Sequence, residues 1–296
     1  MKLHDERKGV IALVILAFGF GLVAISARYL SYSFTLFQQL YLSIGVAFLF
    51  GIPIFGRKLR ISKITKIPHK DWALLFSRVI LGYLLGASLY RQSLVLTKVS
   101  NVVFLQSIPF GAIIGFTLFR EKISAKKILF IALAFIGAVL ISVKDLSHLL
   151  TFGSGEFLAL ISGAFFSLSY TLRKWQSEFL NNEETTQLLF LIAFIILFVI
   201  SIMNHEGLPH FNWNGIILIA LLFTGLLNTI NLFLTNYGYQ RVPVVLATNI
   251  LMLEAVFGTV LALIFYKELP NLKELLGGIL IIVSVIQMNK VEEKEK

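Results

Sequence analysis

Three charged side chains stand inside long apolar stretches of this sequence: Arg78, Arg91 and Glu254. An ionised side chain at the centre of a membrane helix costs about 2.5–3.5 kcal/mol on insertion scales, so each is a candidate for function. A guanidinium offers two parallel donors to a carboxylate or phosphate. A carboxyl group among apolar residues can bind and release a proton. These residue types therefore indicate ligand binding and proton exchange.

Glu254 lies near the centre of the apolar run 243–266, about eleven residues or roughly 16 Å from either end of a helix. At that depth its carboxyl group cannot reach bulk water along the helix, so we expect it to face a watery cavity or a partner group. There it would serve as a proton-binding switch. A carboxylic acid hydrogen-bonded between helices is the alternative, and both interpretations stay open. Proton coupling is the only cofactor-like requirement that we expect, and no cofactor is predicted.

Arg91 lies about seven residues, or roughly 10 Å of helix, before Lys98. Three interpretations are open. Its long stem can extend to the membrane interface, it can pair with Glu254 as a gate, or it can anchor a ligand carboxylate or phosphate. Arg78 is close to a basic connection, so we expect its long stem to extend to the membrane interface.

Neutral polar residues form a weaker set of candidates on several apolar runs: Gln106, Tyr170, Asn228, Asn231 and Asn249. Each alone is typical of helix-to-helix hydrogen bonding, which contributes under about 1 kcal/mol in membranes. Together they favour a polar central cavity.

Pro109 interrupts the hydrogen bonding of its helix and is a candidate hinge. The segments "GYLLG" at 82–86 and "GAIIG" at 111–115 are small-xxx-small patterns that allow two helices to pack closely. The same patterns allow dimerisation, so the chain is expected to be a monomer or a homodimer.

The composition requires a membrane protein. The chain has 296 residues, of which 57% are hydrophobic and 14% charged, and its mean hydropathy is +0.84. The net charge of +10 falls in short connections rather than in a basic stripe, so we predict no nucleic-acid partner. The chain has no cysteine, which excludes disulfides and thiolate metal sites, and no other metal site is predicted. The expected partners are the lipid bilayer and a small molecule.

Ten apolar runs are long enough to cross the hydrocarbon of a bilayer, which takes about 20 helical residues. Helix is predicted for all of them because the runs lack the alternation of barrel strands. We therefore predict an all-α integral membrane fold. The runs cover 9–27, 34–55, 72–96, 99–119, 126–143, 155–172, 185–203, 213–237, 243–266 and 272–289.

Lys and Arg are concentrated in alternate connections, beginning with the N-terminal segment and the loop 56–71. Because cytoplasmic loops are enriched in these residues, both termini are predicted to be cytoplasmic.

An internal repeat relates the two parts of the chain. Residues 110–121, "FGAIIGFTLFRE", resemble residues 257–268, "FGTVLALIFYKE", and Gly9 aligns with Gly155 at a spacing of 146. We predict two repeats, 1–146 and 147–296, with five spans each. An odd number of spans inverts the second repeat, and inverted repeats place a binding site near the membrane midplane and support alternating access. Duplication retained only for packing is the alternative.

The runs 78–121 and 237–268 resemble the third to fourth and eighth to ninth helices of EamA-type transporters in the drug/metabolite transporter superfamily. The resemblance implies a secondary carrier of the bacterial inner membrane, often an exporter of amino acids or related small metabolites, with a central cavity between the repeats. Two positions depart from the family: Ala255 stands where proline often follows Glu254, and "FQQLYL" at 37–42 lacks a common arginine. The resemblance therefore implies a family and not a substrate.

Two other classes of function are alternatives to a carrier. A channel or other non-carrier membrane protein is the nearer alternative. A membrane enzyme is the least favoured, because such enzymes need His, Asp or Cys clusters within the spans and the histidines here lie in connections. They are His4, His69, His148, His205 and His210.

Overall fold

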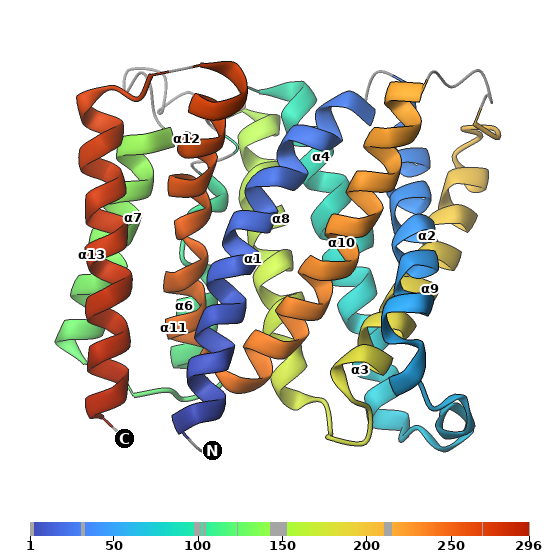
Figure 1. Cartoon of the computed structure of the whole chain (residues 1–296), viewed down its shortest axis with the longest axis horizontal. Helices are drawn as coiled ribbons and strands as arrows, with labels where there is room; N and C mark the ends of the chain where they lie inside the picture. Colours follow the sequence, from blue (N-terminus) through green and yellow to red (C-terminus); the bar gives the residue numbers. More distant parts are fainter. Residues whose placement is uncertain are drawn as a thin grey trace.

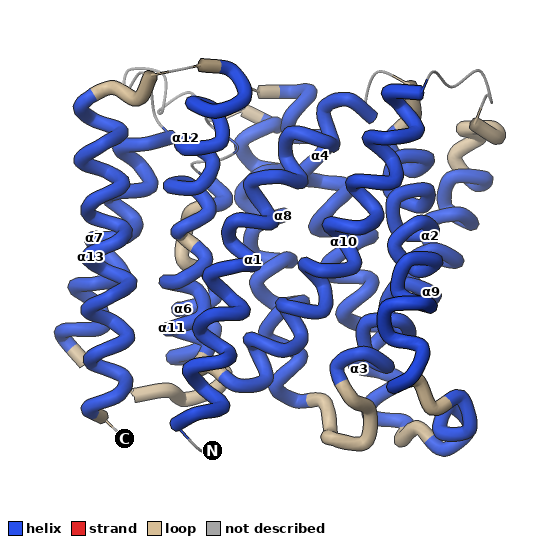
Figure 2. The backbone as a smooth tube through the Cα atoms, viewed as in Figure 1, coloured by secondary structure: helices blue, strands red, loops and turns tan. Residues whose placement is uncertain are grey.

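The computed structural model describes residues 3–30, 33–97, 102, 105–122, 124–142, 153–209, 215–267 and 269–295. All regular elements in these ranges are helices, which confirms the predicted all-α class (Figure 2). The helices stand side by side across the molecule, and the two termini lie at the same end (Figure 1).

The first half contains one helix that begins near the N-terminus, a loop with two short turns of helix, and a long bent helix. Its described elements are α1 (Leu3–Leu30), α2 (Leu36–Phe55), η1 (Gly56–Lys58), η2 (Ile61–Lys66), α3 (His69–Val79), η3 (Ile80–Ala87), α4 (Ser88–Leu96), α6 (Phe110–Thr117) and α7 (Ala125–Ser142).

The second half follows a similar order. Its elements are α8 (Ser154–Thr171), η5 (Leu172–Trp175), α9 (Asn182–Met203), α10 (Gly215–Arg241), α11 (Val244–Leu251), α12 (Leu253–Tyr266) and α13 (Leu272–Lys294). Capping boxes fix the start of two of these helices. Asn271 Oδ1 accepts from Glu274 N–H at 2.9 Å, and Glu274 Oε2 accepts from Asn271 N–H at 2.9 Å.

Eight stretches of the described residues are long and apolar enough to cross a membrane. The helix α1 covers the first predicted span as one continuous element. The fourth predicted span, 99–119, is described mainly through α6, because residues 98–101 and 103–104 lie outside the described part. A total of ten spans stays a prediction. The eight are Leu36–Lys58, His69–Leu96, Ala125–Ser142, Ser154–Trp175, Asn182–Met203, Gly215–Arg241, Val244–Phe265 and Leu272–Lys294.

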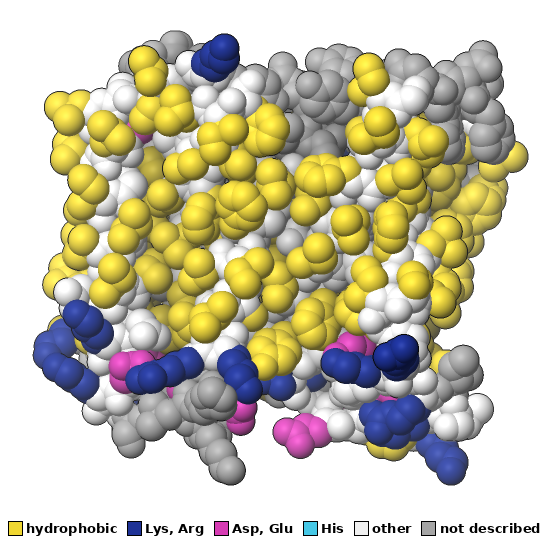
Figure 3. Space-filling model, viewed as in Figure 1, with side chains coloured by type: hydrophobic (Ala, Val, Ile, Leu, Met, Phe, Trp, Pro, Cys, Tyr) yellow, Lys and Arg dark blue, Asp and Glu magenta, His cyan; other side chains and the backbone are white. Residues whose placement is uncertain are grey.

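The outer surface is a belt of large apolar side chains (Figure 3). Ile11, Leu49, Val95 and Ile219 are among those that are exposed. Exposed apolar area on this scale is unfavourable in water and is typical of a surface that faces lipid tails. Lys and Arg gather at the end that holds both termini (Figure 3), and we call this the basic end. It includes Arg57, Lys58, Arg60, Lys63, Lys127, Arg241 and Lys290.

Helices of one half pack on helices of the other in related pairs. In the first half α1 packs along α10, and in the second α8 packs along η3 and α4. Two further pairs, α2 with α9 and α7 with α13, join equivalent helices of the two halves. At the crossing of α7 and α13, a carbon added to Gly137 would lie 2.5 Å from Gly277 O. A carbon added to Gly277 would likewise lie 2.5 Å from Gly137 O. The packing therefore follows the predicted repeat.

Two spans depart from the continuous helices predicted over 72–96 and 243–266. The first contains a π-helical segment, η3, between α3 and α4. The second is broken at Met252, between α11 and α12, where Met252 N–H donates to Asn249 O and Ala255 N–H donates to Met252 O, both at 3.2 Å. These three-residue turns replace the four-residue ladder of the helix. Apolar residues continue through the break, so hydropathy alone could not predict it.

The span equivalent to α11 and α12 in the first half is also interrupted. Pro109 lies at the start of α6, and the backbone before it forms a turn in which Ile108 N–H donates to Leu105 O at 3.3 Å. Proline has no N–H to continue a helix. The breaks at Met252 and before Pro109 both lie in the fourth predicted span of their half.

Candidate functional site

Glu254 lies in the first turn of α12, directly after the break at Met252. Its side chain is exposed although it sits midway along the stretch Val244–Phe265. Its charge acts on the hydroxyl groups of Tyr90 and Tyr170, which belong to other helices. The free N–H groups at the start of a helix favour a carboxylate. The helix break therefore gives this acid a polar position at the depth of the membrane centre.

An aromatic cluster lies beside Glu254 and contains Phe20, Tyr90, Phe166, Tyr170 and Tyr239. The Tyr170 ring stacks on Phe20 and Phe166, with centroid distances of 6.1 and 6.0 Å. Tyr239 lies 5.8 Å from Tyr170, and Tyr90 meets Phe166 edge-on at 6.3 Å. The rings come from both halves of the chain. They form an apolar wall with several hydroxyl groups, which suits a small ligand with a polar and an apolar part.

Arg91 is half-buried on α4, and its Nη1 donates to Gln39 Oε1 of α2. Gln39 is held in turn, because its Nε2 donates to Phe34 O at 2.9 Å. Within the described residues Arg91 forms no ion pair with Glu254. Both charges lie within electrostatic range of the Tyr90 hydroxyl.

Gln106 and Asn249 hold helices together. Gln106 Nε2 donates to Ala159 O at 3.0 Å and to Ser162 Oγ at 2.5 Å on α8. Asn249 Nδ2 donates to Ser284 Oγ at 3.1 Å, which joins α11 to α13. The geometry of both side chains is that of interhelical packing.

Asn228 and Asn231 lie one turn apart on α10. Asn228 is half-buried, whereas Asn231 is 4% exposed. Neither the oxygen nor the nitrogen of the Asn231 amide has a hydrogen-bond partner in the described part of the chain. The amide packs against Gly19 of α1, where an added carbon would come to 2.1 Å from Asn231 Oδ1. The Asn231 amide therefore keeps its full hydrogen-bonding capacity for water or a ligand.

Arg78 departs from its expected place at the membrane interface. It is 2% exposed and donates to three neutral acceptors of the second half. Its Nε–H bonds Ser169 O at 3.1 Å, its Nη1 bonds Gln176 Oε1 at 2.6 Å, and its Nη2 bonds Asn236 Oδ1 at 2.5 Å. The acceptors are far away in sequence, so only the charge within an apolar run could have drawn attention to Arg78.

A second buried arginine that the sequence did not single out, Arg173 of η5, is 1% exposed. Its Nε and Nη2 donate to Asn182 Oδ1 at 3.3 and 2.9 Å. A relay of amides and a hydroxyl connects it to Arg78: Asn236 Nδ2 donates to Thr186 Oγ1 at 2.8 Å, and Thr186 Oγ1 donates to Asn182 O at 2.7 Å. We call Arg78, Arg173, Gln176, Asn182 and Asn236 the arginine cluster.

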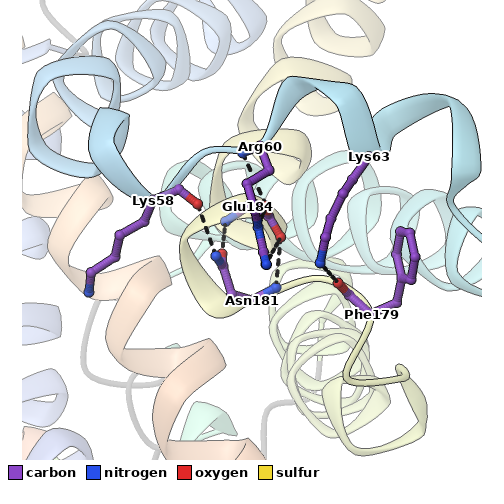
Figure 4. Close-up of polar contacts among 6 residues, drawn as sticks. All are labelled: Lys58, Arg60, Lys63, Phe179, Asn181 and Glu184. Atoms are coloured by element: carbon purple, nitrogen blue, oxygen red, sulfur yellow. Dashed lines mark hydrogen bonds and ion pairs between the residues drawn. The ribbon is translucent and has the colours of Figure 1, made fainter.

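Polar contacts join the two halves at the basic end (Figure 4). Glu184 accepts from Arg60 Nε at 2.9 Å and from Arg60 N–H at 3.1 Å, which raises the pKa of Arg60 above its usual range. Asn181 Nδ2 donates to Lys58 O at 3.0 Å, and Lys63 Nζ donates to Phe179 O at 3.0 Å. The connection η1–η2 of the first half is thereby fixed to the start of α9.

Glu121 adds another contact between the halves at this end. Its Oε1 accepts from Val244 N–H at 2.6 Å and its Oε2 from Val245 N–H at 3.0 Å. These are orphan donors of α11, so a carboxylate of the first half caps a helix of the second. The internal repeat aligns Glu121 with Glu268, but Glu268 lies outside the described residues.

Other parts of the described surface offer weaker sites. A groove of about 420 Å³ between α1, α12 and α13 is lined mainly by apolar residues, including Val10, Leu253 and Ile282, and opens toward lipid. No group of His, Cys, Asp or Glu in the described ranges could hold a metal ion.

Comparisons with known proteins bear on the whole chain. The family model for the EamA-like transporter family matches residues 7–143 and again residues 153–290. A solved structure described as "Crystal structure of protein" has a TM-score of 0.79 and 14% sequence identity, covering 99% of this chain and 100% of that one. At that identity the likeness concerns the fold alone. No curated protein matches the sequence. The boundary between the repeats at 146 and 147 stays a prediction.

Proposed function

The chain belongs to the EamA-like transporter family, and from this we propose that it moves a small polar metabolite across a membrane as a secondary active transporter with alternating access. The substrate class that we propose is an amino acid or a related compound. Glu254 would bind an ammonium group, Arg91 a carboxylate, and the aromatic cluster the remainder of the molecule. The matched family is one of membrane transporters, which agrees with a protein that is not an enzyme.

The observation that carries this proposal is the position of Glu254. An acid with an accessible side chain, at a helix break in the middle of a span, is the arrangement that transporters use for substrate and coupling ions. Glu254 belongs to the second half and Arg91 to the first, so a ligand held by both would sense any movement of one half against the other.

We propose that the basic end faces the cytoplasm of a bacterial cell, because basic residues mark the cytoplasmic side of inner-membrane proteins. The contacts of Figure 4 would then close the inner end in this conformer. Alternating access requires these contacts to open. We propose that the chain has ten spans in two inverted repeats, which would let the two ends of the molecule open in turn.

Transport by purified protein in liposomes tests the proposal. A thermal-shift screen of amino acids, nucleosides, purines and vitamins at two pH values identifies ligands, and each ligand is then measured as a radiolabelled substrate in counterflow. We expect saturable counterflow that is lost in Arg91→Ala and weakened, but not lost, in Glu254→Gln. Single-channel conductance without counterflow would favour the alternative, a channel. A protein that no ligand stabilises and that shows neither counterflow nor conductance would contradict both the carrier and the channel.

A further inference from the structure

The arginine cluster holds buried positive charge without an ion-paired carboxylate in the described ranges. Arg78 is 2% exposed and Arg173 is 1% exposed, and neither takes part in an ion pair. The Arg173 charge acts on Arg78, and the Arg241 charge acts on Arg173. A buried charge is unfavourable by several kcal/mol unless an opposite charge accompanies it. The cluster therefore favours an anion.

The nearby carboxylates do not fill this need. Asp71 is 1% exposed, and it accepts from Ser177 N–H at 2.9 Å and from the Ser177 hydroxyl. Asp71 and Glu178 act on Arg173 from a distance without hydrogen-bonding to it. Neither is among the acceptors of Arg78, which are all neutral.

The unsatisfied polar atom in the cluster is a donor. Gln176 is 8% exposed, and its Oε1 accepts from Arg78 at 2.6 Å, while its Nε2 has no hydrogen-bond partner in the described residues. A buried amide nitrogen in this state leaves a hydrogen bond unmade at a cost of about 1–3 kcal/mol. A free donor beside excess cationic charge is complementary to an oxyanion and not to a cation or a neutral apolar group.

We propose that the arginine cluster is a binding site for an oxyanion, a carboxylate or phosphate group, which replaces the Gln176 and Asn236 oxygens on the Arg78 guanidinium. In the present conformer these two amides occupy the positions of the anion. The guanidinium groups are too deeply buried to be reached from solvent, so the site fills when the basic end opens. An anion bound there competes with Gln176 and Asn236 for the Arg78 guanidinium and so favours a conformer in which these two contacts are broken. The proposal is independent of transport, because it concerns binding alone.

Inorganic phosphate is the first probe. Purified protein in a neutral detergent is titrated with phosphate at constant ionic strength, and its unfolding temperature and phosphate-32 binding by equilibrium dialysis are measured. We expect the unfolding temperature and the amount of bound phosphate both to rise to saturation, because a ligand that binds the native state stabilises it. Arg78→Lys keeps the charge but loses the fork of donors, and we expect about tenfold weaker binding. Arg57→Gln, at the exposed surface of the same end and outside the contacts of Figure 4, should leave phosphate binding unchanged.

Gln176→Glu is the variant that keeps the proposal testable if Arg78→Lys fails to fold. It places a carboxylate within the cluster without changing the number of side-chain atoms. We expect a higher unfolding temperature than in the parent protein and little or no phosphate binding. Gln187→Glu is the matched control, because Gln187 is 6% exposed and also has an unpartnered amide atom, but has no described arginine partner. We expect it to lower the unfolding temperature.

Three further titrations identify the source of the anion. Acetate, chloride and a short-chain phosphatidylglycerol replace phosphate in separate experiments. Stabilisation by phosphate or acetate, but not by the lipid, indicates a soluble oxyanion, and stabilisation by the lipid alone indicates a headgroup phosphate; either supports the oxyanion site. Equal effects of chloride and phosphate, no saturable effect of any anion, or an undiminished effect in Gln176→Glu would overturn it.

Discussion

Gly9 and Gly155 occupy equivalent packing positions in the two halves of the molecule. A carbon added to Gly9 on α1 would lie 2.7 Å from Val242 Cγ2, just after the end of α10, and one added to Gly155 on α8 would lie 2.9 Å from Thr97 Cβ, just after the end of α4. In each case a glycine in the first two turns of a helix lets the last turn of a partner helix approach closely. The two contacts are related by the sequence repeat.

A valine at either glycine is expected to destabilise the protein. Overpacking of a tight site costs about 1–3 kcal/mol, so Gly9→Val and Gly155→Val should both lower the unfolding temperature in detergent by a similar amount. Gly56→Ala serves as the control, because an added carbon there meets no atom within 4 Å. Thermal unfolding followed by tryptophan fluorescence measures all three. A Gly155→Val protein as stable as Gly56→Ala would contradict the equivalence of the two contacts.

The sequence predicted the class of fold and the pairing of these glycines because both depend on local patterns. Long apolar runs require membrane helices, and the match of Gly9 with Gly155 is visible as a spacing. The break at Met252 was not predictable, because residues on both sides are equally apolar. The break places Glu254 in the first turn of a helix rather than at the centre of one.

The candidate site was predictable in part, and the limit has a physical origin. Charge inside an apolar run identified Arg78, Arg91 and Glu254, but the environment of each depends on residues more than fifty positions away. The interface position expected for Arg78 was wrong, because Ser169, Gln176 and Asn236 supply acceptors from the other half. Arg173 has the same buried character but lies at the end of its run, where a cation is ordinarily solvated.

Transport by Glu254→Gln should lose its dependence on pH. Glutamine keeps the size and hydrogen bonding of the acid but cannot exchange a proton. Uptake of an identified substrate into proteoliposomes is measured with and without a pH gradient. We expect exchange of substrate for substrate to be retained more than gradient-driven accumulation. Asn249→Asp is a control for a change of charge at a packing position. A Glu254→Gln protein that still accumulates substrate in response to the pH gradient would exclude the proton-switch role of Glu254.

Removing the Glu121 carboxylate should weaken the connection between the halves. Loss of a helix cap costs about 0.5–2 kcal/mol, and Glu121→Ala leaves two N–H groups of α11 without an acceptor. Glu121→Gln retains an acceptor oxygen for one of them, so its unfolding temperature should lie between those of the alanine variant and the parent protein. Equal stability of the parent protein and Glu121→Ala would show that the cap contributes nothing.

Acid should weaken the ion pairs of Lys127. Lys127 Nζ lies 2.9 Å from Glu292 Oε2 and 2.8 Å from Glu295 Oε2. The hydrogen bond from Lys127 lowers the pKa of Glu295, which follows the end of α13. A lowered pKa in the folded state means that the pair contributes stability above the ordinary pKa of a carboxyl group, and that this contribution disappears as the pH falls through the folded value.

Glu295→Gln tests this dependence. At neutral pH we expect a small decrease in stability, under about 1 kcal/mol because the pair is partly exposed. The difference between the parent protein and the variant should vanish once the pH falls below the lowered pKa of Glu295 in the folded state, where the carboxyl group is protonated in both states. Unfolding temperatures over a series of pH values provide the comparison. A difference that grows toward acid pH would contradict the assigned direction.

Breaking the pair of Arg60 and Glu184 should open the basic end. Thr185, beside Glu184 on α9, is 1% exposed, and its hydroxyl has no hydrogen-bond partner in the described part of the chain. Thr185→Cys is therefore a mild substitution, and because the chain has no cysteine of its own, a thiol reagent reports on that position alone. We expect slow modification in the otherwise unchanged protein and faster modification, by up to about tenfold, when Glu184→Gln removes a charge-assisted bond.

The matched control for this experiment is Glu274→Gln with the same cysteine. Asn271 and Glu274 form the same type of capping box as Asn181 and Glu184, but at the start of α13. That substitution should leave the modification of the cysteine at its slow rate. Equal acceleration by both substitutions would indicate general loosening of the helices, and no acceleration by Glu184→Gln would mean that the contacts of Figure 4 do not control access to the basic end. Selective acceleration connects a single ion pair to the opening that alternating access requires, and it does so without knowledge of the substrate.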